Sequence, residues 1–329
     1  MKTFRLIGMV VMAVLMCVNF TSCSSDDGDI EPNKPQKPKE YMVSLGFTGE
    51  ISVSESPLSR TETEEKNDLY GFIVQSCPNI EGKTSYEPYA YGLFDDITSI
   101  KVKLLDGYKY RFATTMIVNG KNVIRDVSGQ YKWPFNMDLT NEFTYSDALK
   151  GYEIEYGHIN EPTYERYTAD RYYGATSGFV PSEENNSVSI YMKRVVFGAK
   201  FVAENLSEGT LIVSMEKTPT YIGLTPDENE YENIFSLYGV KSAYESDEYI
   251  ENVKLNLIWK KEDAVNVPLG EPTISFKRNK LTTVTIKVAD LSSDKDISIE
   301  LEDEEMGEGD NITIENGKII DTIIGTETE

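Results

Sequence analysis

The sequence predicts an all-β protein built as two strand-rich, sandwich-like halves. Short runs in which apolar and polar residues alternate recur after residue 40, for example at 43–48, 100–105, 253–259 and 281–288. Alternation with period two is typical of strands that bury one face. Turn residues separate these runs, and no segment has the spacing of a long amphipathic helix. We place the boundary between the two halves near residue 190.

The chain begins with a segment typical of exported proteins. Lys2 and Arg5 precede a mostly apolar run at 6–20, and Thr21, Ser22 and Cys23 follow it. A basic start, an apolar centre and small residues at the end are the marks of a secretory signal peptide. The apolar run is short for a transmembrane helix, which needs about 20 residues.

This signal resembles that of a bacterial lipoprotein. The resemblance implies a signal peptide at 1–22, cleavage between Ser22 and Cys23, and lipid attachment at Cys23. Three acyl chains would then anchor the protein in the outer membrane, where two already suffice. The acidic stretch at 24–29 resembles the export tag of surface lipoproteins from certain gut and oral Gram-negative bacteria. The alternatives are an ordinary signal with an incidental cysteine, and retention at the inner leaflet.

Residues 23–40 are expected to form a tether between the lipid and the folded body. Pro32, Pro35 and Pro38 recur every three residues, with lysines between them. This spacing favours an extended polyproline-type segment of about 3.1 Å per residue.

Composition restricts the partners and the chemistry. The 329 residues contain 32 Lys and Arg against 55 Asp and Glu, for a net charge of −23. Such a charge argues against nucleic acid and anionic lipid headgroups as partners. After cleavage and lipidation only Cys77 remains free, so no disulfide within the chain is available. We interpret Cys77 as a small residue at the end of a strand.

Turn signals organise the first half. Asp106 and Gly107 lie between two β-rich runs at 100–105 and 108–118 and predict a hairpin. Asn119 and Gly120 end the second run in the same way. The apolar run at 69–75 predicts a further strand. A polar, tyrosine-rich interval follows at 126–186, in which residues 138–150 are a candidate short helix.

Further β-rich runs fill the second half, at 188–202, 211–215, 253–259, 281–288, 297–301 and 319–324.

Three stretches resemble sequences of the fimbrillin-type adhesins and pilus subunits. They lie at 68–74, at 193–202 with 209–211, and at 276–287. The resemblance implies two tandem transthyretin-like β-sandwich domains, at 41–189 and 190–329, and a function in cell adhesion or as a fimbrial component. In that family an arginine-specific protease often cuts near the first strand, and a segment of a neighbouring subunit fills the groove that the strand leaves.

Carried over to this chain, the resemblance implies a cut after Arg60 and the displacement of residues 42–48. The candidate donor strand contains Ile319, Ile320, Ile323 and Ile324. A sandwich without an edge strand exposes unpaired main-chain groups that a donor strand would pair. Such a head-to-tail contact propagates into a filament. The alternatives are an unremarkable loop arginine and a last strand that belongs to the second half.

No catalytic constellation is present, so we expect no enzyme activity. His158 is the one histidine, and we therefore expect neither a metal site nor a cofactor. The acidic residues at 301–311 do not have the spacing of a calcium loop and are interpreted as a solvated loop. The expected partners are the outer membrane, other fimbrial subunits, and host or bacterial surface ligands.

An alternative function is glycan binding by a surface lipoprotein of a polysaccharide-uptake system. In that reading Trp133 and the tyrosines between 152 and 173 would stack on sugar rings.

Overall fold

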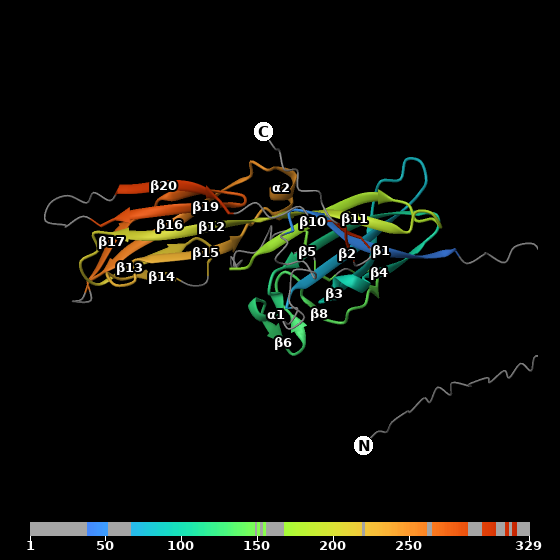
Figure 1. Cartoon of the computed structure of the whole chain (residues 1–329), viewed down its shortest axis with the longest axis horizontal. Helices are drawn as coiled ribbons and strands as arrows, with labels where there is room; N and C mark the ends of the chain where they lie inside the picture. Colours follow the sequence, from blue (N-terminus) through green and yellow to red (C-terminus); the bar gives the residue numbers. More distant parts are fainter. Residues whose placement is uncertain are drawn as a thin grey trace, which may run out of the picture. The chain divides into compact units, whose positions relative to one another are not determined.

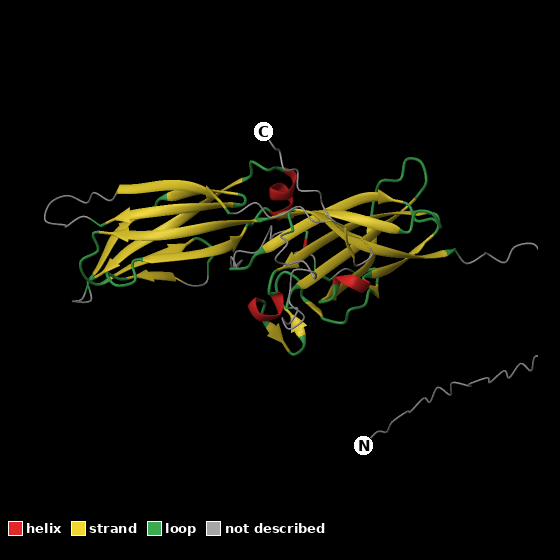
Figure 2. Cartoon of the chain, viewed as in Figure 1, coloured by secondary structure: helices red, strands yellow, loops and turns green. Residues whose placement is uncertain are grey.

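Strands make up nearly all of the regular structure (Figures 1 and 2). The computed structural model describes residues 38–51, 67–148, 150–151, 154–155, 168–218, 221–261, 265–288, 298–306, 313–315 and 318–320. In these residues no helix has the length and apolar character needed to span a membrane. The all-β prediction is confirmed.

A ten-stranded sheet, here called the first sheet, has the order β22-β21-β1-β11-β10-β5-β2-β3-β9, and β4 also pairs with β1. Its strands are β1 (Glu40–Gly49), β2 (Leu69–Pro78), β3 (Glu87–Phe94), β4 (Lys101–Leu105), β5 (Tyr108–Ile117), β9 (Thr144–Tyr145), β10 (Arg171–Phe179), β11 (Ser187–Arg194), β21 (Thr313–Glu315) and β22 (Lys318–Ile320).

Two further sheets are built from the strands after Val195. One has the order β15-β12-β19-β20; the other has the order β14-β13-β16-β17, and β18 also pairs with β16. Their strands are β12 (Val196–Glu204), β13 (Thr210–Met215), β14 (Tyr221–Leu224), β15 (Glu230–Ser236), β16 (Ile250–Lys260), β17 (Asn266–Gly270), β18 (Thr273–Lys277), β19 (Lys280–Lys287) and β20 (Ser298–Glu305).

The remaining elements are short. They are the 3-10 helix η2 (Ile97–Ser99), the helices α1 (Gly120–Val123) and α2 (Val240–Glu245), and a small sheet of β6 (Asp126–Val127), β7 (Gln130–Tyr131) and β8 (Met137–Asp138).

Strand β2 is buried on both faces, as its unbroken apolar run predicts. Phe72 and Val74 lie in a core shared with β1, β4 and β11, whereas Leu69 and Ile73 lie in the other core, which includes residues of the segment between β5 and β10. Strand β2 pairs with β3 on one side and β5 on the other. This position explains why it lacks the polar alternation of an outer strand.

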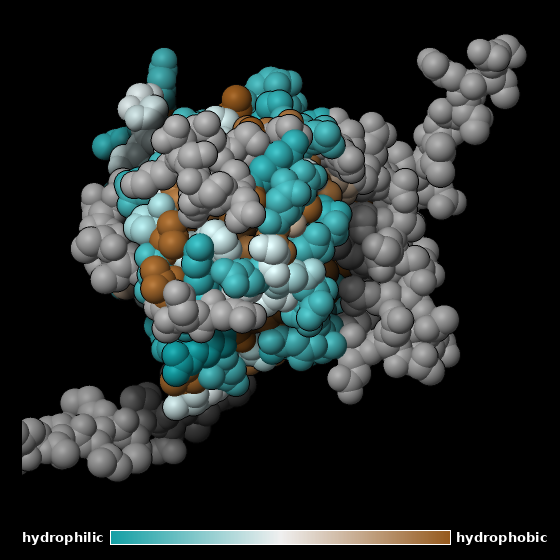
Figure 3. Space-filling view, turned by 90° about the vertical axis from the view of Figure 1, so that its left-hand side faces the viewer, coloured by the Kyte–Doolittle hydropathy of each residue, from teal (hydrophilic) through white to brown (hydrophobic). Residues whose placement is uncertain are grey.

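Strand β16 alternates between buried and solvent-facing residues along almost all of its length. This pattern is that of a sheet with one face on a core and one in water. On the face seen in Figure 3, the residues that are not grey are mostly hydrophilic, and the hydrophobic ones form small separate groups.

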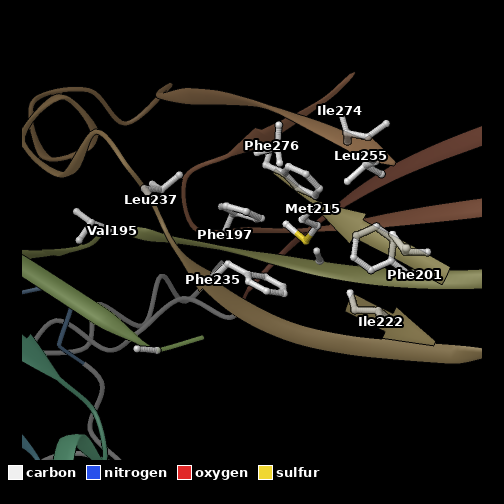
Figure 4. Close-up of a cluster of buried hydrophobic side chains, with 14 of the residues drawn as sticks. Val195, Phe197, Phe201, Met215, Ile222, Phe235, Leu237, Leu255, Ile274 and Phe276 are labelled. Carbon is white, nitrogen blue, oxygen red and sulfur yellow. The ribbon is translucent and has the colours of Figure 1, made fainter. Parts of the chain in front are cut away.

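The core between the two later sheets is rich in phenylalanine (Figure 4). Phe197 of β12 stacks on Phe276 of β18, with ring centroids 4.4 Å apart, and on Phe235 of β15 at 5.6 Å. Because Phe197 and Phe276 come from different sheets, this stack joins the two layers as a sandwich.

Three predictions about local structure are wrong. Asp106 and Gly107 do form a turn, but β4 and β5 do not pair across it: β4 pairs with β1, and β5 pairs with β2 and β10. Residues 138–148 form the end of β8, turns and β9 instead of a helix. The acidic segment expected to be a loop forms strand β20 through Glu305, because it pairs with β19 over eight residues.

The chain passes from the first sheet to the later sheets at Val195, between β11 and β12. Strands β21 and β22 fall in the range assigned to the second domain, yet β21 pairs with β1 through Ile314 and Phe47. At least one strand pairing therefore links the two proposed domain ranges.

Candidate strand-exchange site around β1

Strand β1 pairs with three other strands. Its first half pairs antiparallel with β4, and its second half pairs parallel with β11, in the register Ser44 with Ser187 through Gly49 with Met192. Phe47 also pairs with Ile314 of β21. Strand β1 therefore joins β4 and β21 to the rest of the first sheet.

Alternate residues of β1 enter the core. Val43, Leu45 and Phe47 are at most 2% exposed. The Phe47 ring stacks on Tyr70 and Phe72, with centroids 5.9 and 5.7 Å apart. Removing β1 would therefore leave pockets at every second residue as well as unpaired main-chain groups, which are the two things a donor strand supplies.

The end of β1 is held by a close main-chain contact. Gly49 has a φ of +108°, and a Cβ atom at this position would lie 2.3 Å from the carbonyl oxygen of Met192. The next residue, Glu50, donates its main-chain N–H to that same carbonyl at 2.8 Å. Only glycine fits this bend, which directs the Glu50 side chain toward the later strands.

Glu50 belongs to a cluster of six charged residues, here called the ionic cluster: Glu50, Asp170, Lys193, Arg194, Asp247 and Arg278.

Arg278 lies at the centre of the ionic cluster. Its guanidinium donates to both carboxylate oxygens of Glu50, at 2.8 and 3.2 Å, and to Asp247 at 2.9 Å. Arg194 donates its main-chain N–H to Glu50 at 2.9 Å, and its guanidinium bonds both oxygens of Asp170 at 2.8 Å. Bidentate hydrogen bonds of this kind fix the relative orientation of the two side chains and also add to the attraction between their charges. The hydrogen bond from Lys193 lowers the pKa of Asp247, and Arg278 acts in the same direction.

Tyrosine hydroxyls cover the edge of β4 that faces away from β1. Tyr110 accepts a hydrogen bond from the N–H of Leu105 at 2.7 Å and donates to its carbonyl at 3.2 Å. The N–H of Lys103 donates to Tyr145, and Tyr89 donates to the carbonyl of Lys103, both at 2.8 Å. These hydroxyls occupy the groups that an added strand would need, so this edge is closed to strand pairing.

The tyrosines over β4 also pack on one another. The ring centroid of Tyr89 lies 5.1 Å from that of Tyr110 and 5.6 Å from that of Tyr145. Burial raises the pKa of Tyr110 to about 12, and burial likewise raises the pKa of Tyr89 far above its usual range.

The sequence-predicted site residues are only partly placed by the structure. Ser22, Cys23, Arg60, Ile323 and Ile324 lie outside the described residues, as does His158.

Ile319 and Ile320 lie in β22, where they pair with Ile314 and Thr313 of β21. This hairpin extends from β1 and has no pairing with a strand of the later sheets among the described residues. The donor role of this segment remains a prediction.

Of the aromatic residues expected to bind a glycan, Tyr152, Tyr156, Tyr164 and Tyr167 lie outside the described residues, and those that the structure describes are not at the surface. Trp133 is 4% exposed, with the guanidinium of the fully buried Arg171 5.0 Å from its ring centroid. Tyr172 and Tyr173 are also buried, in the two cores of the first sheet. These rings pack against protein and have no free face for a sugar, so the interpretation of Trp133 as a stacking residue is wrong.

Cys77 lies next to the end of β2 and is buried, as expected of a structural residue. Within the described ranges, no three His, Cys, Asp or Glu side chains gather as a metal ion would require.

Comparison with known proteins finds no matching family model and no matching curated protein. Solved structures do align. A fimbrial assembly protein from Parabacteroides distasonis matches at 10% identity and a TM-score of 0.36, over 84% of this chain and 100% of its own. The tip fimbrial protein Mfa3 from Porphyromonas gingivalis, with a C-terminal truncation, matches at 12% identity and a TM-score of 0.30, over 81% of this chain and 100% of its own. These similarities are loose.

Proposed function

We propose that this chain is a lipid-anchored surface protein that acts in adhesion as a fimbrial component, and that it assembles by replacement of β1. The observation that carries the proposal is the place of β1 in the chain. Among the described residues it is the first strand, it fills core pockets with Val43, Leu45 and Phe47, and it is linked to β2 through residues 50–68.

A cut after Arg60 would separate β1 from the rest of the fold. The strand would then be held only by main-chain pairing, burial and the bonds of Glu50 to Arg194 and Arg278, without a covalent link. Pro57, Ser59 and the acidic residues that follow Arg60 give this stretch the composition of an exposed loop, where proteolytic sites concentrate, although acidic residues next to the bond repel some proteases. The lipid on Cys23 would leave together with β1. Only the uncut precursor would then be anchored in the outer membrane.

In this proposal the freed site accepts residues 319–324 of a neighbouring subunit. Burial of apolar side chains in the vacated pockets would stabilise the contact, and main-chain pairing with β11 would align it. Because donor and acceptor surfaces differ, the contact repeats from one subunit to the next and builds a filament.

We also propose that the strands before and after Val195 belong to two β-sandwich domains, at 41–189 and 190–329. The separate strand pairings of the two regions support this division, apart from the pairing of β21 with β1.

Intact-mass analysis of the surface form tests the proposal. The uncut precursor should carry three acyl chains on Cys23, and the processed form should begin at Thr61. An arginine-specific protease should convert the wild-type chain to filaments visible by electron microscopy, whereas Arg60→Ala should stay uncut and unassembled. Filaments formed equally by both chains would contradict a role for this cut. Unchanged assembly after deletion of residues 318–329 would contradict the donor role.

A further inference from the structure

The buried guanidinium of Arg278 depends on a residue that leaves with β1. Arg278 lies in the turn between β18 and β19 and is 7% exposed. Its Nη1 donates to Glu50 and to the carbonyl of Arg194, and its Nη2 donates to Glu50 and to Asp247. Glu50 directly follows β1, so displacement of β1 takes away the carboxylate that accepts two of these bonds.

Removal of Glu50 would change the net charge of the ionic cluster from zero to +1. With Glu50 present, three carboxylates face three cations; without it, the three cations face Asp170 and Asp247 alone. The N–H of Arg194 would also lose its acceptor. Leaving a buried cation without its anionic partner costs free energy, unless a second anion takes the partner's place. In a chain of net charge −23, this position would become a local site for a carboxylate.

We infer that a strand replacing β1 must bring a carboxylate to the place of Glu50, and that Glu327 of a second copy supplies it. This inference rests on the strand exchange proposed above and adds an anionic anchor to it. Ile320 and Ile324 would fill the groove, and the carboxylate would set the register and reject segments without an acid at this position.

The spacing of the tail matches that of β1. Val43, Leu45 and Phe47 point into the core, and Glu50 follows three residues after Phe47. Ile320, Thr322, Ile324 and Glu327 repeat these intervals in the same direction. In this register Thr326 takes the place of Gly49, where a Cβ atom does not fit, so the tail would make its bend one residue earlier, at Gly325.

The neighbouring register is excluded by the chemistry of the core. If Ile319 and Ile323 pointed inward, Asp321 between them would enter the groove among apolar side chains. A buried carboxylate without hydrogen-bond partners is strongly unfavourable. The register that points Asp321 outward is the one that brings Glu327 to Arg278.

Peptide binding to the cut chain tests this inference. The full mature chain is cut after Arg60, and fluorescent peptides of residues 317–329 are added. We expect the wild-type peptide to bind and Glu327→Gln to bind at least tenfold more weakly. Glu329→Gln removes one charge from the same peptide and should bind within twofold of wild type.

A variant of Arg278 tests the same contact from the side of the cut chain. Arg278→Lys keeps the positive charge but cannot bond both oxygens of a carboxylate, and should reduce the difference between the wild-type and Glu327→Gln peptides to threefold or less. Its circular-dichroism spectrum checks that it is folded.

The outcomes separate the two proposals. If Glu327→Gln and Glu329→Gln weaken peptide binding equally, the effect is one of general charge. This result would contradict the proposed contact of Glu327 with Arg278 but not the strand exchange. A peptide preference unchanged by Arg278→Lys would also overturn the anchor. Failure of every peptide to bind would overturn strand exchange by this tail and the anchor with it.

Discussion

The guanidinium of Arg278 bonds both carboxylate oxygens of Glu50, 228 residues earlier in the chain, at 2.8 and 3.2 Å. The Arg278 side chain is 6% exposed and that of Glu50 is 23% exposed. The pair joins the end of the first strand to the turn between β18 and β19. Its strength therefore contributes to how firmly β1 is held before any cut.

We expect Glu50→Gln to lower the free energy of unfolding by about 2 kcal/mol. Breaking a fully buried pair costs roughly 3–5 kcal/mol, and the partial exposure of Glu50 reduces this figure. Urea unfolding of the uncut chain measures the change. Glu40→Gln is the matched control, because Glu40 lies 3.5 Å from Lys103 in an exposed pair worth less than about 1 kcal/mol. Equal effects of the two variants would show that Arg278 does not depend on Glu50.

Tyr110→Phe should destabilise the chain by about 1–2 kcal/mol, because the N–H and carbonyl of Leu105 lose their common partner. The same change opens the edge of β4, so light scattering should show more aggregation than in wild type. Tyr108→Phe is the control, since the Tyr108 ring lies 6.4 Å from that of Tyr110 and its hydroxyl has no hydrogen bond to a described residue. Aggregation that rises equally in both variants would argue against a capped edge.

Stability should fall as the pH rises from about 10 to about 12. Burial raises the pKa of Tyr110 from its ordinary value of 10.0 to about 12. The unfolded chain thus releases this proton near pH 10, whereas the folded chain keeps it until about pH 12. Since the folded state binds more protons in this window, the free energy of unfolding decreases with pH there and is unaffected by this group below it.

Urea unfolding at pH 8, 10 and 11 measures this dependence. Tyr110→Phe removes the titrating group and should lose less stability than wild type between pH 10 and 11. An identical loss in the two chains would show that Tyr110 does not contribute.

Trp133→Ala should act on stability and not through a sugar contact. Removing this buried ring leaves a cavity and should cost about 3–5 kcal/mol. Tyr221→Ala removes a ring that is 71% exposed and should change stability by less than about 0.5 kcal/mol. Unfolding curves compare the two variants. A folded Trp133→Ala chain of wild-type stability that no longer binds a polysaccharide affinity gel would reverse this interpretation.

Local pattern was enough to predict many strands. The alternation at 253–259 became β16, with its apolar residues in the core, and the unbroken apolar run at 69–75 became the central strand β2. The positions of these residues depend on the period of the strand itself, which a sequence displays directly.

Pattern could not predict which strands pair. Asp106 and Gly107 carry a strong hairpin signal, yet β4 leaves the turn to pair with β1. The acidic residues at 301–311 are predicted to form a loop because their composition is polar, but those up to Glu305 pair with the edge of β19 as part of β20. Both outcomes were decided by neighbours far away in the chain.

The sequence by itself determined that the chain is β-rich and that its signal resembles that of a lipoprotein. Only the tertiary structure placed Glu50 on Arg278, Tyr110 on the edge of β4, and Trp133 inside a core. The physical reason is the separation in sequence over which each interaction acts. Strand periodicity and turn chemistry act over a few residues, whereas ion pairs, edge capping and burial depend on which distant segments the packed sheets bring together.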